Sequence, residues 1–314
     1  MPEHKHLESH RRSHHAPTLL TPQALRHWPL PQPSGETDKE ARGRVLVVAG
    51  SPELPGTAIL SSTATLRAGA GKLQIATVGS IAPHVGVAVP EARVIALPET
   101  QAGGIDPSAA ERLAELAAHC RAVLIGPGMA DTEAIQALLR RLLPELRQTQ
   151  TALVFDSEAM MGLTACLDDV HALETWAVLT PHAGETAGLL GISKEAVQEN
   201  QVATAYRAAG HFRAVVAVKG ATTVIADPDG GAWRNENGNV GLATSGSGDT
   251  LSGIIAGLLA RGAKPAQAVS WAVYVHSAAG DRLSRRIGVL GFLARELLAE
   301  VPVLLAELAH PERA

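Results

Sequence analysis

Short apolar runs rich in β-branched residues alternate with longer helix-like runs along most of this chain, and this alternation limits the folds available to it. Six of the short runs are "RVLVVAG" (44–50), "KLQIATV" (72–78), "ARVIALP" (92–98), "AVLIGPG" (122–128), "ALVFDSEAM" (152–160) and "AVLTPHAGE" (177–185). Between them lie helical patterns, such as 106–120, which begins with Asp106 at an N-cap position and keeps Leu113, Leu116 and Ala117 on one face. The pattern predicts an α/β layered fold with a largely parallel sheet.

The second half of the chain keeps this pattern with one difference. Residues 214–238 read "AVVAVKGATTVIADPDGGAWRNENG", in which the turn residues "DPDGG" separate two β-like stretches. We therefore expect a hairpin here. Helices are expected near 131–147, 193–210, 248–262, 265–284 and 290–308, and no internal repeat or linker interrupts them.

Size and charge narrow the classes of function. The chain has 314 residues, of which 46% are hydrophobic, enough for a substantial core. Its 27 Lys and Arg residues against 31 Asp and Glu residues give no argument for nucleic acid or a membrane surface as a partner. Two cysteines, Cys120 and Cys166, do not make a disulfide framework, and no secretory signal or spanning run is evident, so a cytoplasmic location is expected.

Residues 1–43 differ from the remainder, and we interpret them as a flexible extension that precedes one domain at 44–314. The first part is rich in histidine, and "WPLPQPSGETDKEARG" (28–43) is rich in proline and charge. Five histidines could suggest metal binding, but no cysteine or acidic pattern fixes a geometry, so no metal site is predicted. They are His4, His6, His10, His14 and His15.

Four polar or glycine-rich features follow predicted strands: Gly50–Gly56, Gly126–Gly128, Asp156 and Thr180–Glu185. Ligands of open α/β sheets bind outside the carboxyl ends of the strands. The coincidence predicts a binding site at this edge.

The stretch "ATSGSGDTLSGIIAGLLARG" (243–262) places small residues and an acid before an apolar helix. Gly246, Ser247 and Gly248 can bring helix N-terminal amides close to a phosphate without steric hindrance. An aspartate beside that phosphate is suited to accept a proton from an attacking hydroxyl, which makes Asp249 a candidate base. The alternative is that Asp249 is an ordinary first-turn acid that interacts with the helix dipole.

Six motifs in one order carry a resemblance. They are "GRVLVVAGSPELPGTAILSSTATLRAGAGKLQIAT", "AVLIGPGMA", "LVFDSEAM", "VLTPHAGETAGLLG", "AVVAVKGATTVIADPDG" and "NVGLATSGSGDTLSGIIAGLLARG". Together they span roughly residues 43–284, and the chain resembles the ADP-dependent NAD(P)H-hydrate dehydratase family. The resemblance implies a three-layer ribokinase-like fold. It also implies repair of the S epimer of hydrated NADH or NADPH (NADHX, NADPHX), with ADP or ATP as phosphoryl donor, and release of AMP and phosphate in the ADP reaction.

The resemblance also assigns residues. Asp249 would be the catalytic base and would contact the substrate. The other substrate positions would be Ala58, Gly126, Gly128, Asp156 and His182. The nucleotide positions would be Lys219, Gly220, Ala221, Thr222, Thr223, Gly246, Ser247 and Gly248.

Plainer interpretations stay open for several of these residues. Lys219 could be a surface lysine, His182 a structural loop histidine, and Gly126 and Gly128 parts of a turn. Asp156 could hold Mg²⁺ through water, orient the substrate, or only cap the next helix. Glu185 in the "TPHAGE" loop is a weaker candidate than His182.

Two positions depart from the family pattern: Ala130 replaces a glycine, and Leu54 replaces a frequent tyrosine. The family further implies Mg²⁺, a tetramer or larger homo-oligomer, and a separate epimerase that acts on the same metabolite. The rival functions are a ribokinase-like vitamin or sugar kinase, which stops at a phosphorylated product, and a nucleotide-binding sensor or scaffold without turnover.

Overall fold

The fold is built around one mixed sheet. The computed structural model describes residues 16–32, 39, 40, 42–173 and 177–310. Within them the sheet has the strand order β1-β10-β9-β8-β7-β6-β5-β2-β3-β4. The strands are β1 (Thr18–Leu19), β2 (Arg44–Val48), β3 (Lys72–Val78), β4 (Arg93–Leu97), β5 (Ala122–Ile125), β6 (Ala152–Phe155), β7 (Ala177–Leu179), β8 (Val215–Val218), β9 (Thr223–Ala226) and β10 (Ala232–Asn235).

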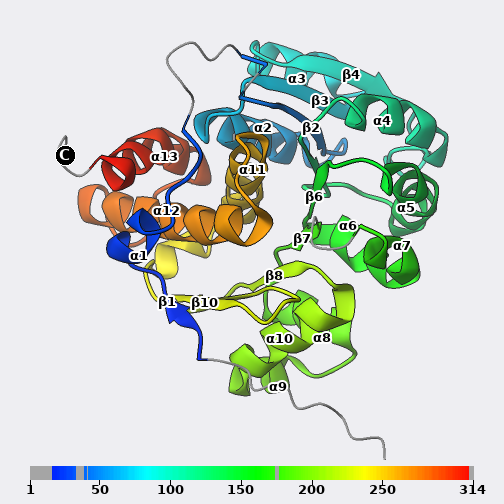
Figure 1. The fold of residues 1–314 in the computed structure, drawn as a ribbon. Coiled ribbons are helices and arrows are strands. Elements are labelled where there is room, and N and C mark those ends of the chain that lie inside the picture. Colours follow the sequence, from blue (N-terminus) through cyan, green and yellow to red (C-terminus); the bar gives the residue numbers. More distant parts are fainter. Residues whose placement is uncertain (1–15, 33–38, 41, 174–176, 311–314) are drawn as a thin grey trace, which may run out of the picture.

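Helices cover both faces of this sheet (Figure 1). The α-helices are α1 (Pro22–Arg26), α2 (Pro55–Arg67), α3 (Ala82–Ala88), α4 (Ala110–Ala117), α5 (Thr132–Leu146), α6 (Ser157–Gly162), α7 (Leu167–His171), α8 (Ala183–Leu190), α9 (Lys194–Glu199), α10 (Gln201–Phe212), α11 (Ser247–Ala260), α12 (Pro265–Arg286) and α13 (Ala294–Ala309). Helices α2, α11, α12 and α13 pack together on one face, while α4, α5 and α10 lie on the other. The predicted three-layer α/β architecture is confirmed.

Strand direction explains where a ligand can bind. From β4 through β3, β2, β5, β6 and β7 to β8, neighbouring strands are parallel. Strand order reverses between β2 and β5, and such a switch point opens a crevice beyond the carboxyl ends of the strands. The predicted hairpin is also confirmed: β9 runs antiparallel to both β8 and β10, and the amide of Asp227 donates to the carbonyl of Gly231 across the turn.

The central helix α11 is buried along nearly its whole length. Gly253 and Gly257, four residues apart, face α2, where a Cβ at either position would collide with the carbonyl oxygen of Ser61 or Thr65. The two helix backbones therefore pack in direct contact, and Thr65 Oγ1 donates to the carbonyl of Gly253 at 3.1 Å. This contact fixes the N-terminus of α11 relative to the sheet.

The expectation of a flexible extension over residues 1–43 is wrong for residues 16–32. Strand β1 adds to the sheet beside β10, and Leu20, Leu25 and Leu30 are buried. Trp28 stacks on Trp233 with ring centroids 5.2 Å apart. The Pro-rich composition concealed a segment that buries apolar side chains. The five N-terminal histidines lie outside the described residues.

Other elements differ from the sequence pattern in detail. The helix expected near 193–210 is two helices, α9 and α10, because Asn200 leaves the helical conformation and caps α10 by accepting from the amide of Ala203. Both cysteines are buried free thiols. Among the described residues, no helix is both long and apolar enough to cross a membrane.

Candidate active site

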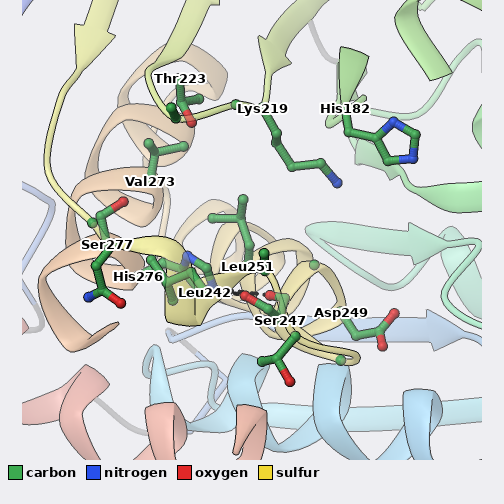
Figure 2. A pocket seen from close by; sticks show the side chains of 18 of the residues that line it. His182, Lys219, Thr223, Leu242, Ser247, Asp249, Leu251, Val273, His276 and Ser277 are labelled. Atoms are coloured by element: carbon green, nitrogen blue, oxygen red, sulfur yellow. Dashed lines mark hydrogen bonds between the residues drawn. The ribbon is translucent and has the colours of Figure 1, made fainter. Parts of the chain in front are cut away.

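A cavity of about 920 Å³ opens beyond the carboxyl ends of the central strands. Asp156 borders it after β6, His182 after β7, and Lys219–Ala221 after β8. The opposite wall is formed by the loop 237–244, the N-terminus of α11, and the α12 residues Val273, His276 and Ser277 (Figure 2). The cavity thus brings together segments that are far apart in the sequence.

The N-terminus of α11 is the part of this wall that can bind an anion. Gly246, the N-cap residue, has φ +86°, a left-handed conformation that glycine adopts without strain. No side chain caps the helix. A Cβ added at Gly248 would lie 3.6 Å from Lys219 Nζ, so the ammonium lies directly over the first turn. Helix dipole and lysine together make this position favourable for an anion.

Asp249 occupies the first turn of α11 and is 9% exposed. Burial, the largest cause, and the negative charge of Asp156 raise the pKa of its carboxyl, Lys219 opposes both effects, and the net result is a rise from 3.8 to about 6. A carboxylate with a pKa near 6 is ionised at neutral pH and still accepts a proton readily. The geometry therefore suits a general base.

Lys219 and Asp156 form the charged centre of the site. Lys219 Nζ lies 3.6 Å from Asp156 Oδ1, which also accepts from Thr180 Oγ1 at 2.9 Å. The other carboxylate oxygen, Asp156 Oδ2, is buried without a hydrogen-bond partner. Asp156 precedes α6 without making a side-chain cap bond, so the capping interpretation is wrong.

His182 combines a structural role with an exposed ring edge. Its Nδ1 accepts from the amides of Gly184 and Glu185, while the Glu185 carboxylate accepts from the amide of His182, a capping box that begins α8. The ring therefore has a fixed orientation. The side chain is 60% exposed at the border of the cavity, and its Nε2 lies 3.7 Å from Glu185 Oε1.

Three predicted substrate positions lie outside the lining of the cavity. Ala58 is fully buried in α2 beneath Gly50. A Cβ at Gly126 would collide with the carbonyl oxygen of Asp156, and one at Gly128 with Thr57. Close packing against the Asp156 backbone therefore explains Gly126, and close packing against the Thr57 side chain explains Gly128. Thr222 also lies outside the lining, whereas Gly220, Ala221 and Thr223 are part of it.

Several lining residues were not predicted from the sequence. They include residues of the 237–244 loop and of helices α11 and α12: Asn237, Asn239, Val240, Leu242, Leu251, Val273, His276 and Ser277. On α12 the signal is a histidine and a serine at positions 276 and 277 within the otherwise apolar stretch 271–280. Sequence alone does not place that face against Ser247.

The side chains around the cavity suit Mg²⁺ only if phosphate groups supply further ligands. Among residues 16–32, 39, 40, 42–173 and 177–310, no group of three or more His, Cys, Asp or Glu side chains is arranged to hold a metal ion. Mg²⁺ commonly binds through one or two carboxylates, substrate phosphates and water. The unpartnered Asp156 Oδ2 beside the anion position fits that mode.

The parallel sheet with its switch point, and an anion position at a buried helix N-terminus, define a ribokinase-like protein. A ribokinase-like superfamily protein from Enterococcus faecalis has a TM-score of 0.80 at 26% identity, covering 94% of this chain and 97% of that one. The sequence model described as NAD(P)H-hydrate dehydratase matches residues 45–303, and the chain belongs to this family.

Two relatives give the family more detail. An ADP-dependent (S)-NAD(P)H-hydrate dehydratase from Xanthomonas campestris is 47% identical over 290 residues, which are 92% of this chain and 96% of the relative. The solved structure of an ADP/ATP-dependent NAD(P)H-hydrate dehydratase from Bacillus subtilis, co-crystallised with ATP and Mg²⁺, has a TM-score of 0.77 at 30% identity. It covers 93% of this chain and 98% of that one. The resemblance in the six motifs is thereby confirmed.

Proposed function

We propose that this chain dehydrates the S epimer of NAD(P)H hydrate to NAD(P)H with ADP as phosphoryl donor, releasing AMP and phosphate. The observation that carries the proposal is the buried Asp249 carboxylate at the N-terminus of α11, facing a cavity with Lys219 over the same helix turn. The family and the names of the two dehydratase relatives support the choice of substrate.

The reaction has two steps. In the first, Asp249 accepts the proton of the ring hydroxyl while that oxygen attacks the β-phosphorus of ADP, and the bond between this phosphorus and the AMP oxygen breaks. The amides of Gly246–Gly248 and the Lys219 ammonium stabilise the phosphoryl charge. In the second, the ring C–O bond breaks, phosphate leaves with the bonding electrons, and loss of a ring proton restores the double bond.

The remaining site residues bind the nucleotide and orient the substrate. Gly220, Ala221, Thr222 and Thr223 follow Lys219 along the proposed nucleotide side. His182, held by its capping box, contacts the substrate, and Asp156 borders the substrate side of the cavity. Ala58, Gly126 and Gly128 act from outside the lining, where their small size allows the close packing behind it. When Mg²⁺ is bound, Asp156 and the nucleotide phosphates would hold it, and it would neutralise phosphate charge.

The proposal also covers where the protein works, its oligomeric state and the enzyme that supplies its substrate. The protein works in the cytoplasm as a homo-oligomer of four or more copies. Since it acts on one epimer, a separate epimerase supplies that epimer from the other.

A recovery assay tests the function. The protein is incubated with hydrated NADH or NADPH and with ADP or ATP in turn, and the absorbance of the reduced ring is followed. We expect absorbance to return only when a nucleotide is present. A stable phosphorylated compound without recovery would instead indicate a ribokinase-like vitamin or sugar kinase, and nucleotide binding without any product would indicate a sensor or scaffold.

A further inference from the structure

His276 lies on α12, 8% exposed, at the wall of the cavity. Its Nε2 is 3.0 Å from the carbonyl oxygen of Ser247 and 3.0 Å from Ser247 Oγ (Figure 2). Ser247 is the first residue of α11, between the two glycines of the anion position. One imidazole nitrogen therefore contacts both the carbonyl oxygen and the hydroxyl oxygen of this residue.

The carbonyl oxygen determines which way these hydrogen bonds run. A carbonyl can only accept, so Nε2 must carry the hydrogen to bond it. Burial lowers the pKa of the His276 imidazole to about 4, which keeps the ring neutral, with its single N–H on Nε2. Ser247 Oγ then accepts from the same N–H, and the hydroxyl hydrogen is left to point elsewhere.

We propose that His276 is a positioning residue: by donating from Nε2 to Ser247, it directs the Ser247 hydroxyl hydrogen into the cavity, where it donates to the phosphoryl group during transfer. This inference rests on the proposed function. An amide alone fixes its hydrogen by backbone geometry, whereas a serine hydroxyl rotates. A second partner is needed to make it a preorganised donor.

Removal of the buried His276 ring also leaves a cavity, so a loss of activity in one variant does not by itself distinguish a positioning role from a structural one. The two roles separate in a double-mutant cycle with Ser247. If His276 acts through the hydroxyl, its removal matters only while that hydroxyl is present. If it supports only the backbone of α11 or the packing of α12, its removal matters equally with alanine at 247.

The test compares His276→Ala, His276→Gln, Ser247→Ala and the double variant His276→Ala/Ser247→Ala in the recovery assay. We expect each alanine variant to lower kcat roughly 100- to 1,000-fold, as loss of one transition-state donor does, with a smaller change in the KM for ADP. The double variant should be no worse than Ser247→Ala alone. His276→Gln, whose amide nitrogen reaches the same place as Nε2, should recover most of the activity. Val275→Ala, a buried neighbour on α12, controls for packing loss and should keep kcat.

Additive losses in the double variant, failure of glutamine to rescue, or an equal kcat loss in Val275→Ala would each overturn the proposal. Should His276→Ala not fold, the cycle is run with His276→Phe, which keeps a ring and lacks the donor. Failure of the proposed function would look different, since the unmodified protein would then give no NAD(P)H at all. In that case the same cycle is measured by calorimetric binding of ADP, where absence of coupling would overturn the inference.

Discussion

Replacement of Asp249 by asparagine should make the protein more stable and inactive at once. The carboxyl is 9% exposed, and its pKa rises from 3.8 to about 6, chiefly through burial. Because one pKa unit corresponds to about 1.4 kcal/mol, the ionised carboxylate destabilises the native state by about 3 kcal/mol at pH 8. Asparagine has nearly the same shape and does not ionise, so it removes this cost.

The rise in the pKa of Asp249 on folding determines the pH range in which Asp249→Asn is more stable than the parent protein. Well below pH 3.8 the carboxyl is protonated in both native and unfolded chains, and the variant gains nothing. Between about pH 4 and pH 6 the unfolded chain is ionised while the native carboxyl is still largely protonated, so the advantage of Asp249→Asn grows over this range and reaches its full size above pH 7. At pH 5 the difference should be about half of that at pH 8.

Thermal unfolding at pH 5 and pH 8 measures this difference. At pH 8 we expect Asp249→Asn to raise Tm by about 5 to 10 °C. The matched control is Asp168→Asn, an exposed first-turn acid of α7, where only a few tenths of a kcal/mol are at stake. In the recovery assay kcat should fall by a factor of about 10² to 10⁴. A variant that is no more stable at pH 8 than the parent, or that retains turnover, would refute the reasoning.

Four further substitutions have definite expected outcomes. Lys219→Gln should raise the KM for ADP at least tenfold and move the acidic limb of the kcat/KM pH profile upward, because Lys219 lowers the pKa of Asp249; an unmoved limb would contradict the assigned contact. Gly253→Ala should lower the free energy of unfolding by about 1 to 3 kcal/mol through overpacking between α2 and α11. Gly210→Ala, at an exposed position of α10 with open space around it, should raise the free energy of unfolding by about 0.5 to 1 kcal/mol. Urea titration measures both changes. Leu25→Ala should cost about 2 to 5 kcal/mol because this side chain is fully buried, and a loss within error would show that the N-terminal segment is not part of the core.

The alternation of apolar and helical runs predicts the layers and most of the sheet, because each run must bury one face against the next element. The turn "DPDGG" predicts the hairpin correctly since its residues suit the required backbone. Asp249 could likewise be placed at a helix N-terminus from the sequence, because small residues preceded an apolar helical run. These features depend on neighbours along the chain.

Features that depend on distant contacts were not predictable. The position of His276 against Ser247 requires the packing of α12 on α11, and no local pattern encodes it. The buried segment around Leu25 was missed because its proline content is also typical of linkers. Gly126 is a glycine because the backbone of Asp156 passes close by, a reason that only the folded chain reveals.

The stoichiometry of the reaction tests the central claim most directly. NAD(P)H, AMP and phosphate are quantified together after the protein is supplied with the S hydrate and limiting ADP. The account predicts one of each per ADP consumed, and formation of all three slower by a factor of about 10² to 10⁴ with Asp249→Asn. Accumulation of a phosphorylated product without NAD(P)H, or recovery of NAD(P)H without consumption of nucleotide, would contradict it.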